Sequence, residues 1–156
     1  MIDLATRVGR ALEAKRLMLA TAESCTGGGV AQAITEIAGS TGWFDAGFVT
    51  YSNASKTGML DVPAALIAQF GSVSEEVAAA MAEGALANSN ADVAVSTTGI
   101  AGPTGAVPGK PVGTVCFGWS RGDTTYTERL VFAGDRHAVR EQTVAHALQG
   151  LLRFIE

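Results

Sequence analysis

The fold of this chain is restricted most by two short apolar runs. Each run ends in a loop that is rich in glycine and threonine. Residues 17–22 (LMLATA) contain no charged or helix-breaking residue, and residues 91–99 (ADVAVSTTG) are almost as apolar. Continuous apolar runs of this length are typical of strands that a sheet buries on both faces. Segments with helical periodicity alternate with these runs, and this order predicts an α/β domain.

The spacing of apolar residues also predicts where the helices lie. Apolar residues recur at helical spacing from Leu4 to Leu12 and predict an amphipathic helix over residues 3–16. The same criterion predicts a helix after the glycines at 27–29, two or three helices before residue 88, and a last helix after residue 135. Ser72 and Glu75 have the spacing of a capping box at the start of one of these helices.

Three further segments have the composition of strands. Residues 46–52 (AGFVTYS) predict a strand that follows the second helix. Residues 112–120 and 124–132 predict an antiparallel hairpin with Gly122 and Asp123 near its tip. The complete order therefore predicts a mixed β-sheet covered by helices.

Length and charge narrow the class of protein. A chain of 156 residues suffices for one domain over residues 1–156, and 47% hydrophobic residues with 17% charged ones indicate a globular protein. The net charge is −4 and no basic run occurs. We therefore expect neither a nucleic acid nor a membrane as partner.

The expected location is the cytoplasm. Charged residues within the first ten positions argue against a secretory signal, and the longest stretch without charge, residues 93–109, is interrupted by Thr, Gly and Pro. Cys25 and Cys116 are then expected to be reduced thiols and not a disulfide.

The segment AESCTGGG, residues 22–29, is the first candidate for chemistry. A strand that leads through glycines into a helix leaves main-chain N–H groups free at the helix start, where an oxyanion or a phosphate is favoured. The segment matches neither a Walker loop, nor GxGxxG, nor the GxSxG elbow of hydrolases. The structural alternative is that Ser24 or Thr26 merely caps the helix while the glycines permit close packing.

The two histidines restrict how a serine nucleophile could be activated. His137 and His146 are nine positions apart on the predicted last helix, so they do not form an i, i+4 ligand pair. Neither cysteine has the spacing of a zinc ligand, and we expect no metal. A serine here would take its base from a lysine or a tyrosine.

Such a base is available after the predicted strand at residues 46–52. Tyr51 ends that strand and Lys56 follows five positions later, at the edge of the sheet where ligands of parallel α/β proteins gather. The alternative is a solvated lysine and a tyrosine at the edge of the core.

Two more segments are candidates for substrate binding. The loop after the second apolar run offers main-chain N–H groups and hydroxyls from Thr98 to Gly102. Arg136 and Arg140 lie one turn apart behind Asp135, on one helix face that suits a phosphate or carboxylate. A structural loop, and a capping aspartate with two solvated arginines, are the alternatives.

Taken together, these segments resemble a known family. AESCTGG, GFVTYSNASK, VSEEVAAAMAEGA, TGIAGPTG, KPVGTV and GDRHAVREQT occur in the order and spacing of the CinA C-terminal family, from about Leu4 to Leu152. Its characterised enzymes are nicotinamide-nucleotide amidohydrolases. Larger members carry an additional N-terminal MoaB-like domain, so the resemblance implies only the amidohydrolase part here.

The resemblance implies hydrolysis of the carboxamide of nicotinamide mononucleotide (NMN) to nicotinate mononucleotide and ammonia. The family's serine, tyrosine and lysine match Ser24, Tyr51 and Lys56. We expect Lys56 to act as an uncharged base, directly or through Tyr51, with a pKa lowered by burial. A nucleotide-binding regulatory module, an oligomerisation domain and an amidase of another substrate remain as alternatives.

The remaining expectations concern the surroundings of the nucleophile. No cofactor is needed, and a homo-oligomer is expected. The expected oxyanion donors are the N–H groups of Thr26, Gly27 and Gly28. The expected substrate-binding residues are Thr98, Gly99, Ala101, Gly102, Arg136 and Arg140, with Lys110 in reserve.

Overall fold

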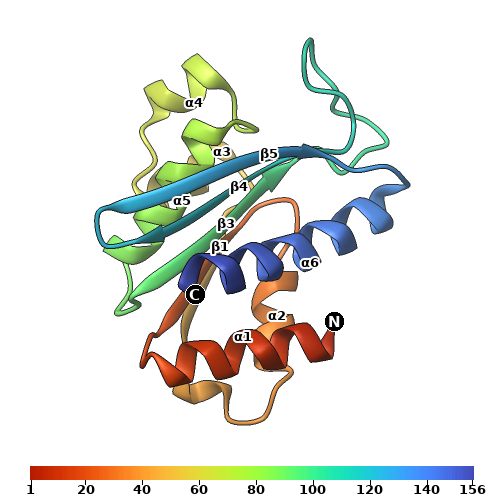
Figure 1. The fold of residues 1–156 in the computed structure, drawn as a ribbon. Coiled ribbons are helices and arrows are strands. Elements are labelled where there is room, and N and C mark those ends of the chain that lie inside the picture. The colour runs from red at the N-terminus through yellow and green to blue at the C-terminus, as the bar shows by residue number, and fades with distance from the viewer.

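The computed structural model describes all residues from Met1 to Glu156 (Figure 1). Strands and helices alternate in the first two-thirds of the chain, and a hairpin and a long helix complete it, as the sequence predicts. The elements are α1 (Ile2–Ala14), β1 (Leu19–Glu23), α2 (Gly29–Thr35), the 3-10 helix η1 (Ser40–Gly42), β2 (Phe44–Val49), α3 (Asn53–Leu60), α4 (Ala64–Phe70), α5 (Glu75–Ala87), β3 (Val93–Gly99), β4 (Thr114–Arg121), β5 (Thr124–Val131) and α6 (Arg136–Ile155).

All five strands form one mixed sheet in the order β2-β1-β3-β4-β5. The strand β1 pairs in parallel with both β2 and β3, while β4 runs antiparallel to β3 and to β5. The turn of the β4–β5 hairpin lies at Gly122 and Asp123, as predicted. Because β1, β2 and β3 are parallel, the loops that follow them all leave the same edge of the sheet.

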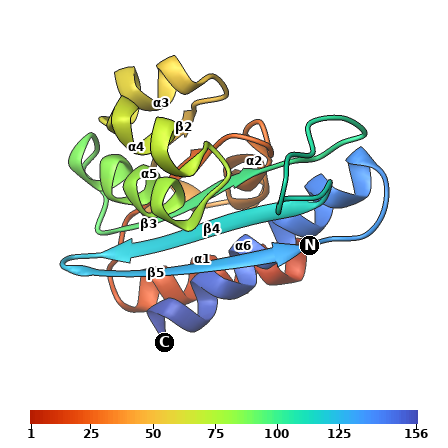
Figure 2. The same cartoon turned by 90° about the horizontal axis from the view of Figure 1, so that it is seen from above.

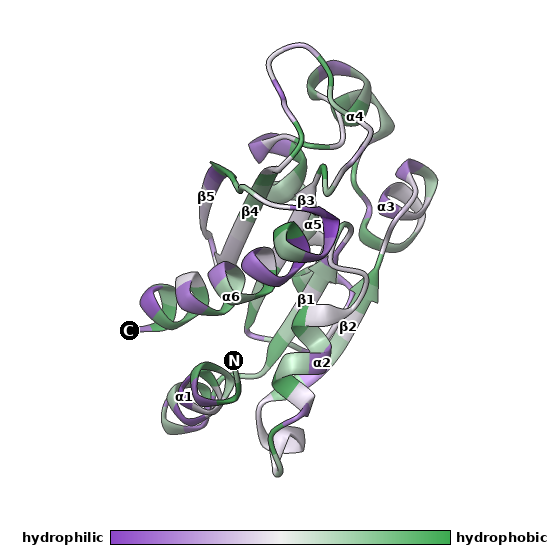
Figure 3. Ribbon diagram, turned by 90° about the vertical axis from the view of Figure 1, so that its right-hand side faces the viewer, coloured by the Kyte–Doolittle hydropathy of each residue, from purple (hydrophilic) through white to green (hydrophobic).

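Helices cover both faces of the sheet (Figure 2). On one face, α1, α2 and α6 pack with β1, β3 and β4 around the larger apolar core, and on the other face α3, α4 and α5 enclose a smaller one. Every residue of β1 is buried, and Figure 3 shows this strand as hydrophobic between the helices. No helix of the chain is both long and apolar enough to cross a bilayer.

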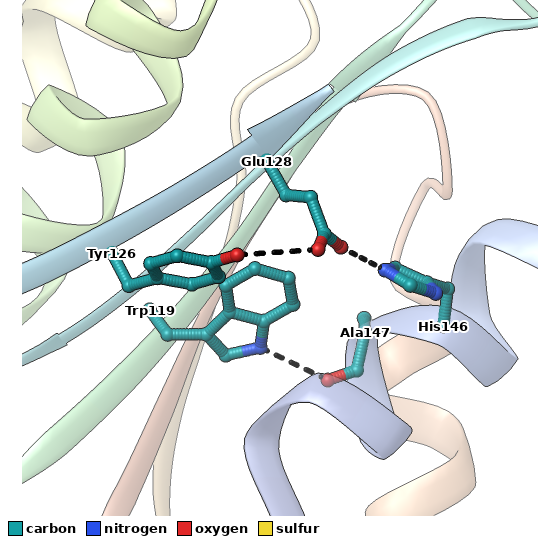
Figure 4. Close-up of polar contacts among 5 residues, drawn as sticks. All are labelled: Trp119, Tyr126, Glu128, His146 and Ala147. Carbon is teal, nitrogen blue, oxygen red and sulfur yellow. Dashed lines mark hydrogen bonds and ion pairs between the residues drawn. The ribbon is translucent and has the colours of Figure 1, made fainter. Parts of the chain in front are cut away.

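The helix α6 docks onto the hairpin through aromatic and polar contacts (Figure 4). The indole N–H of Trp119 donates to the carbonyl of Ala147 at 3.1 Å, and His146 pairs with Glu128. Gly150 permits this approach, because a Cβ there would lie 2.1 Å from the Trp119 ring. His146 is therefore part of the packing between helix and sheet.

Two predicted boundaries differ from the structure. The strand β2 ends at Val49 and not at residue 52, so Tyr51 lies in the connection to α3. Ser72 does not cap α5: the cap is Ser74, whose hydroxyl accepts from the N–H of Val77. The carbonyl of Ser72 instead accepts from the hydroxyl of Thr98, a contact across 26 positions that the local pattern does not contain.

Candidate active site

Ser24 and Lys56 meet at the edge of the sheet where the parallel strands end. Ser24 directly follows β1, and Lys56 lies in α3, which follows β2. Their Oγ and Nζ atoms are 3.1 Å apart. Both side chains are buried, with 7% of Ser24 and 1% of Lys56 exposed. The structure therefore joins two of the predicted catalytic side chains in a direct contact.

The position of Lys56 follows from the way α3 begins. The hydroxyl of Ser52 accepts from the N–H of Ser55 and caps the helix, which places Lys56 in its first turns, facing the end of β1. The Nζ atom lies 3.0 Å from the carbonyl oxygen of Thr50 and 3.1 Å from that of Tyr51. Neither ion pair of the chain includes Lys56. Burial lowers the pKa of Lys56 below its ordinary value.

Cys25 is a less suitable nucleophile than its neighbour Ser24. Burial raises the pKa of the Cys25 thiol to about 12. The thiolate is the reactive form of cysteine, and almost none of it exists near neutral pH at such a pKa. Cys116 lies elsewhere and is likewise a free, buried thiol.

The turn after Ser24 supplies main-chain N–H groups, although not all of the predicted ones. Gly27 donates its N–H to the carbonyl of Ser24 at 3.1 Å, so this donor is already occupied. The N–H groups of Cys25, Thr26 and Gly28 donate to no other residue of the chain. Gly28 has a φ of 104°, a left-handed conformation that favours glycine.

The N-terminus of α2 does not offer an open anion site, because Glu23 occupies it. The Glu23 carboxylate, 1% exposed, accepts from the N–H groups of Val30 at 2.9 Å and Ala31 at 3.0 Å. It also accepts from the hydroxyl of Thr26. Sequence reasoning missed Glu23, and the available signal was a carboxylate at the end of an otherwise uncharged strand.

Tyr51 and Arg136 border a cavity of about 370 Å³. Neither Ser24 nor Lys56 lines it, and Tyr51, whose carbonyl accepts from Lys56, connects the cavity to the pair. The Tyr51 side chain is 64% exposed, and its hydroxyl lies 3.4 Å from Nη2 of Arg136. The Tyr51 phenol therefore contacts Arg136 and not the pair, and only the Tyr51 carbonyl reaches Lys56.

The loop between β3 and β4 forms another wall of this cavity, and Figure 1 shows it projecting from the sheet. Gly99, Ala101 and Gly102 line the cavity together with Lys110. Arg136 donates to the carbonyl of Gly102 at 2.9 Å. The N–H groups of four loop residues donate to no group of the chain: Ala101, Gly102, Thr104 and Gly105.

Two of the predicted substrate-binding residues lie outside this cavity. Thr98 is 1% exposed, and its hydroxyl is occupied by the carbonyl of Ser72. Arg140 donates through Nε to the carbonyl of Cys25 at 3.1 Å and lines a different cavity, of about 360 Å³, with Thr26 and residues of α1 and α2. Their shared helix face predicted a common binding site for Arg136 and Arg140, but the two side chains line different cavities.

The residues do not form a metal site. No group of three or more His, Cys, Asp or Glu side chains is arranged to hold a metal ion. His137 is exposed and pairs with Glu141 along the helix, whereas His146 pairs with Glu128 of β5. The groups available for chemistry are therefore a hydroxyl, an amine and main-chain N–H donors.

Relatives of the chain have closely similar sequences and structures. A protein of Pseudomonas putida named nicotinamide-nucleotide amidohydrolase PncC is 55% identical over 97% of this chain and 94% of its own length. Its namesake in Escherichia coli strain K12 is 53% identical over 97% of this chain and 92% of its own.

Similarity extends to a solved structure. A crystal structure described as a competence-damaged protein (CinA) superfamily protein from Klebsiella pneumoniae 700603 superposes with a TM-score of 0.96 at 40% identity, covering 99% of this chain and 96% of the other. The model of the CinA C-terminal domain matches residues 1–155. With its fold and its sequence in agreement, the chain belongs to the CinA C-terminal domain family.

Proposed function

We propose that this protein hydrolyses the carboxamide of NMN to nicotinate mononucleotide and ammonia, with Ser24 as nucleophile and Lys56 as base. The names of the relatives support the substrate. The observation that carries the mechanism is the 3.1 Å contact between a buried amine and a serine hydroxyl. A domain that only binds nucleotides has no need for this pair.

The surroundings of Lys56 suit an uncharged amine. A neutral amine has two N–H donors and one lone pair, and Nζ has three oxygen neighbours: two main-chain carbonyls and Ser24 Oγ. In the charged state Nζ donates to all three oxygens; in the proposed uncharged state the carbonyls of Thr50 and Tyr51 accept its two N–H groups and its lone pair accepts from the Ser24 hydroxyl. Since burial lowers the pKa of Lys56, the basic form is available nearer neutrality than in an exposed lysine.

In the first step, Ser24 Oγ attacks the carboxamide carbon and its proton passes to Lys56 Nζ. The negative charge moves to the carboxamide oxygen, and the free N–H groups of Thr26 and Gly28 are the proposed donors to it. One such donor contributes roughly 3 kcal/mol in other enzymes. Gly27 is excluded from this role because its N–H is bonded to Ser24.

In the second step, the C–N bond breaks and the protonated Lys56 gives its proton to the departing nitrogen, which leaves as ammonia. The product is an ester between Ser24 and the nicotinoyl group. Water then attacks this ester, Lys56 accepts a proton from the water, and Ser24 recovers its hydrogen as nicotinate mononucleotide departs.

The cavity that Tyr51 and Arg136 border is the proposed site of the nucleotide. Arg136 is a fixed cation at its wall, and the free N–H groups of the loop from Ala101 to Gly105 are further donors to a phosphate. The exposed ring of Tyr51 borders the same cavity and is proposed to contact the substrate, in place of relaying a proton. A homo-oligomer remains a prediction, to be checked by light scattering.

The test is ammonia release from NMN by the wild type and by Ser24→Ala. We expect turnover by the wild type and a loss of at least about 1,000-fold in the variant, as for nucleophiles in other hydrolases. Ser89→Ala, at the opposite edge of the sheet, is the matched control and should keep the full rate. Near-normal turnover by Ser24→Ala would exclude Ser24 as nucleophile, and absence of turnover by the wild type would reject NMN as substrate.

A further inference from the structure

We propose that Glu23 is a positioning residue, whose buried carboxylate, with Thr26 and Thr97, holds the turn that carries Ser24. This inference deepens the proposed function and rests on it, because it concerns the same nucleophile. Glu23 touches no reacting atom in this scheme. It acts through the geometry of the main chain between β1 and α2.

The Glu23 carboxylate is bound entirely by neutral donors. It accepts from two N–H groups in the first turn of α2 and from the Thr26 hydroxyl. Neither ion pair of the chain includes it. The positive end of the helix and these charge-assisted hydrogen bonds therefore stabilise the charge. An apolar residue of similar size would avoid the desolvation cost of a buried carboxylate, so packing alone does not account for Glu23.

Thr26 links Glu23 to the neighbouring strand. Its hydroxyl proton is directed to Glu23, so its oxygen accepts from the Thr97 hydroxyl, 2.8 Å away. Thr97 lies beside Glu23 in the register of β1 and β3. The carbonyl of Thr97 also accepts from the N–H of Ser24 at 2.9 Å. Thr97 thus contacts the turn through both its side chain and its main chain.

The turn is consequently held at both ends. At the strand end, the carbonyl of Glu23 accepts from the N–H of Thr50 at 2.8 Å, and Ser24 bonds to Thr97. At the helix end, the Glu23 side chain binds α2. The same residue therefore fixes Ser24 relative to the segment whose carbonyl at Thr50 orients Lys56. It also occupies the N-terminus of α2.

The first variant is Glu23→Gln, which keeps the shape but removes the charge and turns an amide –NH2 toward one of the donors. Because a displacement of about 1 Å costs on the order of 100-fold in rate, we expect kcat for NMN to fall about 10-fold to 100-fold. KM should stay within roughly threefold, since the cavity is not altered.

A second pair of variants covers the case in which Glu23→Gln does not fold. Thr97→Val removes the hydroxyl at nearly constant shape and should lower kcat at least about threefold, whereas Thr97→Ser, which keeps the hydroxyl, should recover most of the loss. The matched control is Thr143→Val in α6, where a buried hydroxyl donates to the carbonyl of Val139. It loses a comparable hydrogen bond and should keep the kcat of the wild type.

Amide hydrogen exchange gives a readout without substrate. The N–H groups of Ser24, Val30 and Ala31 should exchange at least about 10-fold faster in Glu23→Gln than in the wild type, relative to the core strands. Faster exchange with unchanged kcat would overturn the positioning role, and so would a change in KM alone. If the wild type releases no ammonia from NMN, the proposed function fails. Independently of that result, unchanged amide exchange in Glu23→Gln would show that Glu23 does not hold the turn.

Discussion

Gly84 in α5 lies against the C-terminus of α3, the helix that carries Lys56. A Cβ at Gly84 would lie 1.9 Å from the carbonyl oxygen of Leu60 and 2.8 Å from its carbonyl carbon. Real Cβ atoms do not approach closer than 3.0 Å. In Gly84→Ala, the end of α3 must therefore move away from α5 by about 1 Å. The obstacle is main chain, which has no rotamer with which to avoid the new methyl group.

This displacement should reduce both stability and activity. Overpacking costs about 1–3 kcal/mol, and the gain in helix propensity from Gly to Ala offsets about 1 kcal/mol of it. For a chain of this size each kcal/mol corresponds to roughly 2–4 °C in Tm, so Tm should fall by a few degrees. Lys56 lies one turn before Leu60, so a shift of about 1 Å in α3 should also lower kcat by about 10-fold to 100-fold.

The control is Gly58→Ala, the same substitution in α3 itself. A Cβ at Gly58 would have no atom within 4 Å, and the residue is exposed. This variant should match or exceed the wild type in Tm and keep its kcat. Thermal unfolding by circular dichroism and ammonia release from NMN measure both quantities. If Gly84→Ala behaves like Gly58→Ala in both assays, the close approach of α5 does not position Lys56.

Three further predictions concern Lys56, the two arginines of α6 and the two cysteines. Lys56→Met should abolish turnover. Because the pKa of Lys56 is lower in the folded protein than in the unfolded chain, the wild-type free energy of unfolding should rise with pH up to the unfolded pKa of about 10.4. Urea unfolding of both proteins at several pH values should show a smaller rise in the variant. Arg136→Ala should raise KM for NMN more than KM for nicotinamide riboside. Arg140→Ala, which loses a contact to the Ser24 turn, should instead lower kcat for both substrates. If steady-state kinetics showed the same behaviour for the two variants, the assignment of Arg136 to the phosphate would be contradicted. Native protein at pH 8 should resist iodoacetamide at Cys25 and Cys116, since burial raises their pKa values to about 12 and about 11, and labelling by mass spectrometry should appear only after unfolding.

The pairing of Ser24 with Lys56 shows how far local information extends. Each residue follows a parallel strand, and parallel strands that end at one edge of a sheet bring the residues after them together. The sequence order therefore sufficed to predict the mixed sheet and the hairpin, whereas the family resemblance singled out this pair among the candidates. The lowered pKa of Lys56 could only be expected in general terms, because it follows from burial, which depends on the packing around the side chain.

Hydrogen-bond partners were the part that the sequence could not supply. A glycine turn before a helix predicts free N–H donors, but which donors remain free depends on contacts from elsewhere. Gly27 bonds within the turn, and the carboxylate of Glu23 takes the donors of α2. Helical spacing placed Arg136 and Arg140 on one face, yet only the packing of α6 against the turn directs Arg140 to Cys25.

The sequence alone thus determined the order of elements and the residue types at the strand ends, because periodicity and turn chemistry are local properties. The tertiary structure decided which polar groups are available for catalysis. The contacts of Thr26 with Thr97 and of Arg140 with Cys25 join residues 71 and 115 positions apart. A hydrogen-bond donor or a charged group can bind a substrate only if it is not already bonded to such a distant residue of the chain.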